Sequence, residues 1–172
     1  MLTPVADRRN ACLAALARGA RTSSSQYLRL ARTTLQDLMA RDDLLAGIEL
    51  RRTPGGYART LLFGEGGISV WAMTWSPGSQ TSVHDHHCSC CFGLWSGLLR
   101  EVWFRAISDA EAVATGEAIR EPGYVACMMP SGPNLHQMLN SSPDEAISIH
   151  VYGFDHEVHA SSIEREYRVV AG

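Results

Sequence analysis

The feature that most constrains this chain is the segment 78–97, GSQTSVHDHHCSCCFGLWSG. His84 and His86 flank Asp85, and alternate side chains of an extended strand share one face. Both imidazoles would then lie on the same face, roughly 7 Å apart along the backbone. Two imidazoles placed in this way can bind one metal ion from one side. His87 points to the opposite face, so we do not expect it to be a ligand.

A second segment supplies a further histidine among glycine, proline and asparagine residues. In chain order these residues are Gly123, Pro130, Gly132, His136 and Asn140. If His136 arrives from a distant strand, then His84, His86 and His136 form a set of three neutral metal ligands. Such a set suits Fe(II), and three histidines with a water molecule also suit zinc. The ligand set alone therefore leaves the metal open.

Composition and charge exclude several classes of protein. The chain has 172 residues, 45% of them hydrophobic and 19% charged, which is enough for one domain with a real core. The net charge of −3 and the lack of a basic run speak against nucleic-acid and anionic-membrane partners. No apolar run approaches the roughly 18 residues of a membrane span, and the N-terminus lacks the apolar core of a signal peptide.

The cysteine pattern bears on the compartment of the cell. There are 5 cysteines, an odd number, and three of them fall within 88–91. We do not expect a disulfide framework from this pattern, which fits a reducing cytoplasm. Cys88 and Cys91 also form a C-x-x-C, but the chain has no second such pair, so a zinc knuckle is not favoured.

The hydrophobic pattern divides the single domain, 1–172, into a helical segment, 1–47, and a β segment, 48–172. A helix is expected over 5–18, and a short third helix is expected from Asp42. The apolar face of the second helix is formed by Tyr27, Ala31, Leu35 and Leu38. We expect these helices to cover one side of a sheet.

The β segment consists of short β-rich runs separated by glycine and proline turns, beginning with a run at 48–53. Many short strands without intervening helices predict a mainly β fold, an antiparallel barrel or sandwich. We expect the tail, 156–170, to add an edge strand or a loop.

Together the two segments resemble the two halves of the cupin signature. Glycines bracket the His-x-His pair, and a Pro-x-Gly-x-x-x-His-x-x-x-Asn pattern follows downstream. Within the cupins, the chain resembles the cysteine dioxygenase family of thiol dioxygenases. The residues that carry this closer resemblance are Tyr57, Arg59, Trp75, Cys91, Ser148, His150 and Tyr152. The resemblance covers 57–152 and implies a small jelly-roll β-barrel whose mouth holds Fe(II).

The resemblance also implies a crosslink next to the metal. In many members of the family, the cysteine that matches Cys91 is joined through a thioether to the tyrosine that matches Tyr152. The spacing of Cys91 from His86 matches the family. We therefore expect this chain to be able to form a Cys91–Tyr152 thioether.

Three alternating residues of one run, Ser148, His150 and Tyr152, share one face of a strand. They are expected to form a hydrogen-bond relay in which Ser148 orients His150, and His150 holds the Tyr152 hydroxyl toward the metal site. A Ser–His pair is also found in hydrolases, where serine is the nucleophile and histidine the base. The chain lacks a G-x-S-x-G motif, so a hydrolase is not favoured.

Substrate selection is assigned by resemblance to Arg59. A guanidinium can bind a carboxylate through two parallel hydrogen bonds, and Tyr57 on the same strand face can add a hydroxyl. Family members with arginine at this position tend to take cysteine, and those with glutamine tend to take 3-mercaptopropionate. Trp75 is expected to line the cavity wall near the metal.

The sequence thus predicts a cytoplasmic, non-haem Fe(II) thiol dioxygenase that converts L-cysteine to cysteine sulfinic acid. Its partners would be a small thiol and O2, and we expect a monomer or a small homo-oligomer. One alternative is the same reaction on another small thiol carboxylate, 3-mercaptopropionate or mercaptosuccinate. A second alternative is a non-catalytic, metal-binding cupin that acts as a sensor.

Overall fold

The computed structural model describes residues 4–19, 24–130 and 134–171, so Gly132 of the second segment lies outside the described residues. Two helices, α1 (Pro4–Gly19) and α2 (Ser24–Met39), precede the strands. The strands are β1 (Tyr57–Glu65), β2 (Ile68–Trp75), β3 (Val83–His86), β4 (Cys90–Ser96), β5 (Leu99–Ala106), β6 (Glu111–Arg120), β7 (Val125–Met128), β8 (His136–Leu139), β9 (Ala146–Tyr152) and β10 (Ile163–Val169). Neither described helix is long and apolar enough to cross a membrane.

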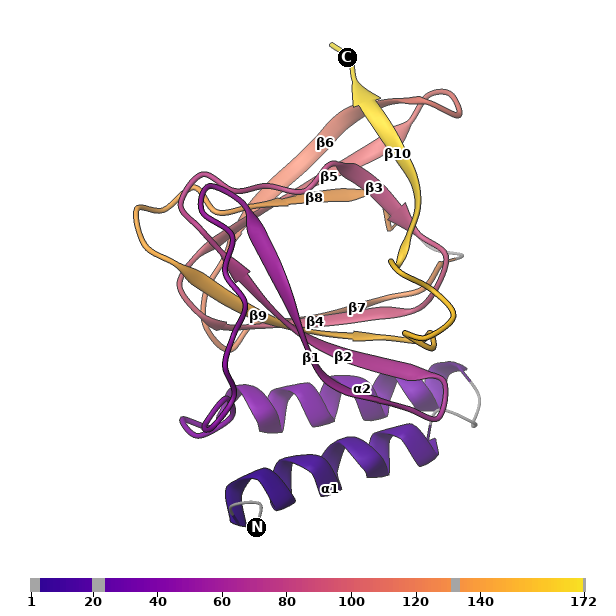
Figure 1. Ribbon diagram of the computed structural model, residues 1–172. Helices are drawn as coiled ribbons and strands as arrows, with labels where there is room; N and C mark the ends of the chain where they lie inside the picture. The colour runs from indigo at the N-terminus through magenta and orange to yellow at the C-terminus, as the bar shows by residue number, and fades with distance from the viewer. Residues whose placement is uncertain (1–3, 20–23, 131–133, 172) are drawn as a thin grey trace.

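The strands form two sheets that face each other around a common interior (Figure 1). One sheet has the order β1-β2-β9-β4-β7, and the other has the order β10-β3-β8-β5-β6. A parallel pairing between β10 and β6, at Arg168 and Glu111, closes the second sheet on itself. The expectation of a mainly β, jelly-roll type of fold is therefore confirmed.

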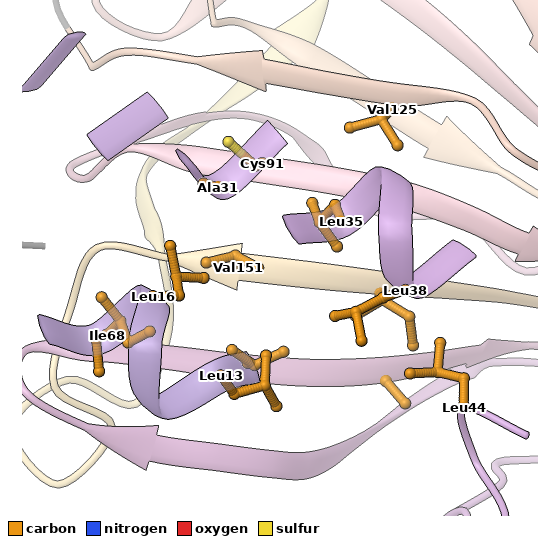
Figure 2. Packing of buried hydrophobic residues seen from close by; sticks show 14 of the residues in the cluster. Leu13, Leu16, Ala31, Leu35, Leu38, Leu44, Ile68, Cys91, Val125 and Val151 are labelled. Carbon is orange, nitrogen blue, oxygen red and sulfur yellow. The ribbon is translucent and has the colours of Figure 1, made fainter. Parts of the chain in front are cut away.

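Both helices cover the outer face of the first sheet (Figure 1). The α2 residues that the helical pattern picked out, Tyr27, Ala31, Leu35 and Leu38, are all buried. They pack with α1 leucines and with every second residue of the strands, such as Ile149 and Val151 on β9 (Figure 2). The central strands β2 and β9 are therefore buried on both faces, between the helices and the interior of the barrel.

Three sequence-based expectations need correction. No third helix begins at Asp42, because 42–47 form turns with i→i+3 hydrogen bonds and end at Gly47, whose φ is 73°. The run 48–53 is not a strand. Its backbone instead contacts neighbouring side chains: Arg51 N–H donates to Thr60 Oγ1 at 2.8 Å, for example. Finally, the tail strand β10 is not an edge strand, since it pairs with β3 on one side and β6 on the other.

The turn between β4 and β5 gives a stability prediction. Gly97 has φ 77°, and a Cβ there would lie 2.6 Å from Cα of Ala146. Gly123 has φ 89°, with nothing within 4 Å of a Cβ. Gly123→Ala should cost about 1–2 kcal/mol of unfolding free energy from the left-handed backbone alone. Gly97→Ala should cost about 3 kcal/mol or more, because the β9 backbone must also move.

Urea unfolding of the two variants against the parent protein measures the difference. Equal losses at the two positions would show that the approach of Ala146 to Gly97 does not constrain the fold.

Candidate active site

Three buried histidines meet inside the barrel. His84 and His86 lie on β3, and His136 lies on β8 directly opposite His84. Their ligand nitrogens all lie within 4.8 Å of one another, and Nε2 of His86 is 3.1 Å from Nε2 of His136. Two nitrogens that each bind one ion at about 2.1 Å, at adjacent coordination positions, are separated by roughly 3 Å. The arrangement therefore fits a single metal ion.

The second nitrogen of each ring is engaged. Nδ1 of His84 lies 2.9 Å from the carbonyl oxygen of Ser82, and Nδ1 of His86 lies 3.2 Å from Oγ of Ser162. Nδ1 of His136 lies 3.0 Å from a carboxylate oxygen of Glu101. When each Nδ1 carries the ring hydrogen in these contacts, each Nε2 has a lone pair available for a metal ion.

Electrostatics favours the metal-binding form of the rings. Burial, and after it the neighbouring His136, lowers the pKa of His84 to about 4. Burial, and then His136 and His84, lower the pKa of His86 to about 2. A neutral imidazole is the form that binds a metal ion, so these rings do not need to lose a proton at neutral pH.

A cavity of about 280 Å³ opens beside the three histidines. This volume lies at the small end of the range for ligand sites, roughly 300–1,000 Å³. Residues that the sequence assigned to substrate binding and catalysis line it together with the histidines, namely Tyr57, Arg59, Trp75, His150 and Tyr152. His87 is not in the ligand cluster, and its Nε2 lies 2.9 Å from the carbonyl oxygen of Ser161.

Arg59 sits half-buried in the wall of this cavity. Its Nη2 donates to the carbonyl oxygen of Ala160 at 3.1 Å, and its guanidinium carbon lies 5.3 Å from the centre of the Trp71 ring. Among the described residues no carboxylate pairs with it at salt-bridge distance. The cavity wall thus carries a cation whose charge is not neutralised by an acidic side chain.

A hydrogen-bonded chain runs along β9, in the same sheet as Arg59, and Trp75 sets its direction. The Trp75 indole N–H donates to Ser148 Oγ at 2.8 Å. An indole can only donate, and Trp75 and His150 are the hydrogen-bond partners of the buried Ser148 hydroxyl among the described residues. The hydrogen of Ser148 therefore has an acceptor only if it is donated to Nε2 of His150, 2.8 Å away. Neutral His150 then carries its hydrogen on Nδ1 and donates to the Tyr152 hydroxyl at 3.1 Å. The hydrogen of Tyr152 is left to donate to other groups.

Burial keeps this chain neutral. Burial, and after it the charges of His136, His84 and Arg59, lowers the pKa of His150 to about 3. It also raises the pKa of Tyr152 well above its ordinary value. The structure thus brings Ser148, His150 and Tyr152 together in the expected order, and it adds Trp75 to them.

The position of Cys91 is a correction. Cys91 is paired with Val151 of β9, whereas Cys90 is paired with Tyr152, and cross-strand partners share a face of the sheet. Cys90 accordingly lines the cavity and packs against Tyr152. Cys91 points away from it, into the cluster beneath the helices (Figure 2). The expected Cys91–Tyr152 thioether is therefore wrong, since the two side chains lie on opposite faces.

Cys91 instead forms a disulfide with Cys127 of β7, with the two Cα atoms 4.0 Å apart. We expected no disulfide framework from the sequence, and the structure forms this one disulfide while Cys12, Cys88 and Cys90 remain free thiols. Sequence spacing could not show this pairing, because Cys127 lies 36 residues further along the chain.

Sequence reasoning also missed two residues that contact the histidines, Glu101 and Ser162. Glu101 is a charged residue in an alternating strand pattern, where a solvent-facing position is the ordinary expectation. Ser162 belongs to the tail, for which only an edge strand or loop was expected. The one signal in the sequence was that Glu101 follows Leu99 by two residues and so shares its face of the strand. This signal was weak.

This geometry can now be set beside known proteins. The sequence model of the family described as cysteine dioxygenase type I matches residues 51–160, more than half of the chain. The chain belongs to the cysteine dioxygenase type I family. Membership identifies the protein, at the level of the family, as a dioxygenase, and the three-histidine cluster fits the metal cofactor of such an enzyme.

Several solved structures are similar to part of this chain. An uncharacterised protein with a double-stranded β-helix domain from Klebsiella pneumoniae is 20% identical, with a TM-score of 0.50 over 62% of this chain and 84% of its own. A cupin-superfamily sugar phosphate isomerase from Silicibacter pomeroyi is 20% identical, with a TM-score of 0.47 over 57% and 59%. Oxalate oxidase in complex with glycolate is 18% identical, with a TM-score of 0.48 over 67% and 62%. Among these three, the Klebsiella protein supports the fold alone, and the two weaker matches carry no argument for this dioxygenase.

The depressed pKa of His150 gives a pH prediction for the metal-free dioxygenase. In the unfolded chain a histidine has its ordinary pKa of about 6.5, so the unfolded state takes up a proton that folded His150, with a pKa of about 3, does not. The stability contribution of neutral His150 is complete above about pH 6.5 and is lost progressively as the pH falls below it. Each such histidine contributes a slope that approaches about 1.4 kcal/mol per pH unit.

Between pH 6 and pH 5 the unfolding free energy of His150→Gln should therefore fall less steeply than that of the parent protein. The difference in slope should correspond to the uptake of about one proton on unfolding. Urea unfolding of both metal-free proteins across this range measures it. An identical slope in the two proteins would mean that His150 titrates normally in the folded state.

Proposed function

We propose that this protein is a non-haem Fe(II) thiol dioxygenase that oxidises a small thiol carboxylate, with L-cysteine as the leading substrate. The observation that carries the proposal is the joint presence in one cavity of three histidine ligands without a carboxylate and the unneutralised cation of Arg59. Three neutral ligands leave room for an anionic thiolate, and the arginine suits the carboxylate of the same molecule.

The reaction balances without a further reactant, since R–SH and O2 give R–SO2H. Sulfur is oxidised and both oxygen atoms of dioxygen are transferred to it. When bound, Fe(II) supplies open coordination positions and the redox chemistry that couple a thiolate with dioxygen. The residues of the chain bind the substrate, exclude water from the site and direct the hydroxyl hydrogen of Tyr152 into the cavity.

Substrate orientation is assigned to the β1 side of the cavity. Arg59 would exchange its contact with the carbonyl oxygen of Ala160 for two parallel hydrogen bonds to the substrate carboxylate. Tyr57 lines the same cavity and packs against Trp75, with ring centres 5.1 Å apart, so its ring is held beside the bound carboxylate. The thiol is then directed toward the histidines.

Tyr152 is assigned the role of hydrogen-bond donor to the reacting groups. Its oxygen accepts from His150, so its own hydrogen is available toward the cavity. Its pKa is raised by burial, so the hydroxyl stays protonated and acts as a donor. A donor fixed before the substrate arrives stabilises negative charge that develops on oxygen or sulfur without reorganisation.

The geometry moves the candidate crosslink from Cys91 to Cys90. Cys90 is buried, lines the cavity and packs with Tyr152. A thioether would form with loss of the thiol hydrogen and one ring hydrogen of Tyr152, a two-electron oxidation in which dioxygen is the oxidant. The proposed bond is therefore Cys90–Tyr152, made during turnover.

The test of the function is oxygen consumption and sulfinate formation by the iron-loaded protein with four thiols. These are cysteine, 3-mercaptopropionate, mercaptosuccinate and cysteamine, of which the last lacks a carboxylate. Cysteine should be used best and cysteamine poorly. Arg59→Ala should keep its iron but lose at least about tenfold in kcat/KM on cysteine, since hydrogen bonds to charged groups contribute about 1.5–3 kcal/mol each.

Arg52→Ala is the matched control, because Arg52 is exposed and paired with Glu145 outside the cavity. It should leave kcat/KM unchanged. Equal kcat/KM on cysteamine and cysteine would remove Arg59 from its role, and the absence of oxygen consumption with every thiol would refute the proposed function.

For the crosslink, mass spectrometry of the protein after turnover with thiol and oxygen should show a fraction lighter by two hydrogens. Peptide mapping should place the link between the peptides that carry Cys90 and Tyr152. Cys90→Ala should abolish it, and Cys91→Ala should not, because Cys91 lies on the other face of β4. A linked peptide that persists in Cys90→Ala would contradict the assignment.

A further inference from the structure

Glu101 on β5 is a carboxylate with only 1% of its surface exposed. Its two oxygens are divided between two donors. Oε1 lies 3.0 Å from Nδ1 of His136, and Oε2 accepts from Nε of Arg120 at 2.9 Å. Both contacts join residues far apart in the chain, on β8 and β6. The group is therefore built into the fold behind one of the three histidines.

Arg120 is itself fixed in place. Its guanidinium carbon lies 4.0 Å from the centre of the Tyr124 ring and 4.8 Å from the centre of the Trp103 ring. Its side chain is 12% exposed, compared with 2% for that of Glu101. A buried carboxylate is costly unless it is paired and hydrogen-bonded, and Arg120 and His136 together satisfy that requirement.

The partner of His136 differs in kind from those of the other two ligands. His84 faces a carbonyl oxygen and His86 faces a hydroxyl, which can donate as well as accept. A carboxylate can only accept, so it requires the hydrogen of His136 on Nδ1 and the lone pair on Nε2. Its negative charge also increases the electron density that the ring offers to a metal ion.

We propose that Glu101 is a positioning residue for the metal centre, which fixes the tautomer of His136 and makes this ring the strongest of the three ligands. The carboxylate thereby places next to the site the negative charge that three neutral ligands lack. The inference rests on the proposed function only in requiring that the three histidines bind a metal ion.

Glu101→Gln tests this with little change in shape. An amide has one acceptor oxygen where the carboxylate has two, so His136 and Arg120 cannot both keep a partner. If the oxygen stays with Arg120, the amide NH2 faces Nδ1 of His136 and favours the wrong tautomer. Titration with Co²⁺ in competition with a chromophoric chelator at fixed pH should show affinity lower by about 10–100-fold.

The double variant Glu101→Gln with Arg120→Met distinguishes an effect on the tautomer of His136 from a general loss of protein stability. Without the guanidinium, the single amide oxygen is available to His136, so part of the lost Co²⁺ affinity should return. Thermal unfolding and circular dichroism of the metal-free variants check that each is folded. The Co²⁺ absorption spectrum of the double variant should resemble that of the parent protein more closely than that of Glu101→Gln does.

Glu117→Gln is the matched control, because Glu117 pairs with Arg100 across the same two strands on the exposed surface. It should bind Co²⁺ as the parent does. Parent-like affinity in Glu101→Gln would overturn the inference, and so would the absence of any recovery in the double variant. If the parent protein binds no Co²⁺, the proposed metal site fails as well, so the two failures are distinguishable.

Discussion

The central strands β2 and β9 of the first sheet are buried on both faces, and the site depends on this constraint. On β9, Ile149 and Val151 pack in the cluster beneath the helices, whereas His150 and Tyr152 line the cavity. Because the side-chain period of a strand is two, a slip of one residue would exchange these two sets. Polar groups would then enter the apolar cluster beneath α2. The helix layer therefore holds the relay in register although it does not contact any reacting group.

In the second sheet side chains alternate in the same way, but the outward-facing side is held by contacts with β10 rather than by helices. Between the two histidines of β3, Asp85 is directed outward, where Oδ2 accepts from Nη2 of Arg165 at 2.8 Å and from the Tyr167 hydroxyl at 2.9 Å. Oδ1 accepts from the backbone N–H of Arg165 at 2.9 Å. These contacts join the short β3 strand to β10, which in turn pairs with β6. The C-terminal strand thus holds the metal-binding strand from behind.

Some of this was predictable from the sequence, and the limits have physical causes. His84 and His86 share a face because two residues of one strand obey strand geometry whatever surrounds them. Whether Cys90 or Cys91 faces the cavity depends on the path of the loop 87–89, because this loop decides which residues of β4 share the face of His84 and His86. Counting residues from His86 cannot show that path. Glu101 could not be assigned at all, because its partners lie 19 and 35 residues away and only the folded barrel brings them together.

The participation of Trp75 in the relay has a consequence for how the hydrogens are ordered. A chain made only of hydroxyl and imidazole groups can arrange its hydrogens in two opposite sequences, and a mixture of the two would be populated. The indole has a hydrogen to give and no lone pair to offer, so the reverse sequence leaves the buried hydrogen of Ser148 without an acceptor and is disfavoured. The favoured sequence is the one in which Tyr152 presents its hydrogen to the cavity. This order is encoded in the chemical identity of a wall residue, and a phenylalanine of similar shape would preserve the wall while allowing both sequences.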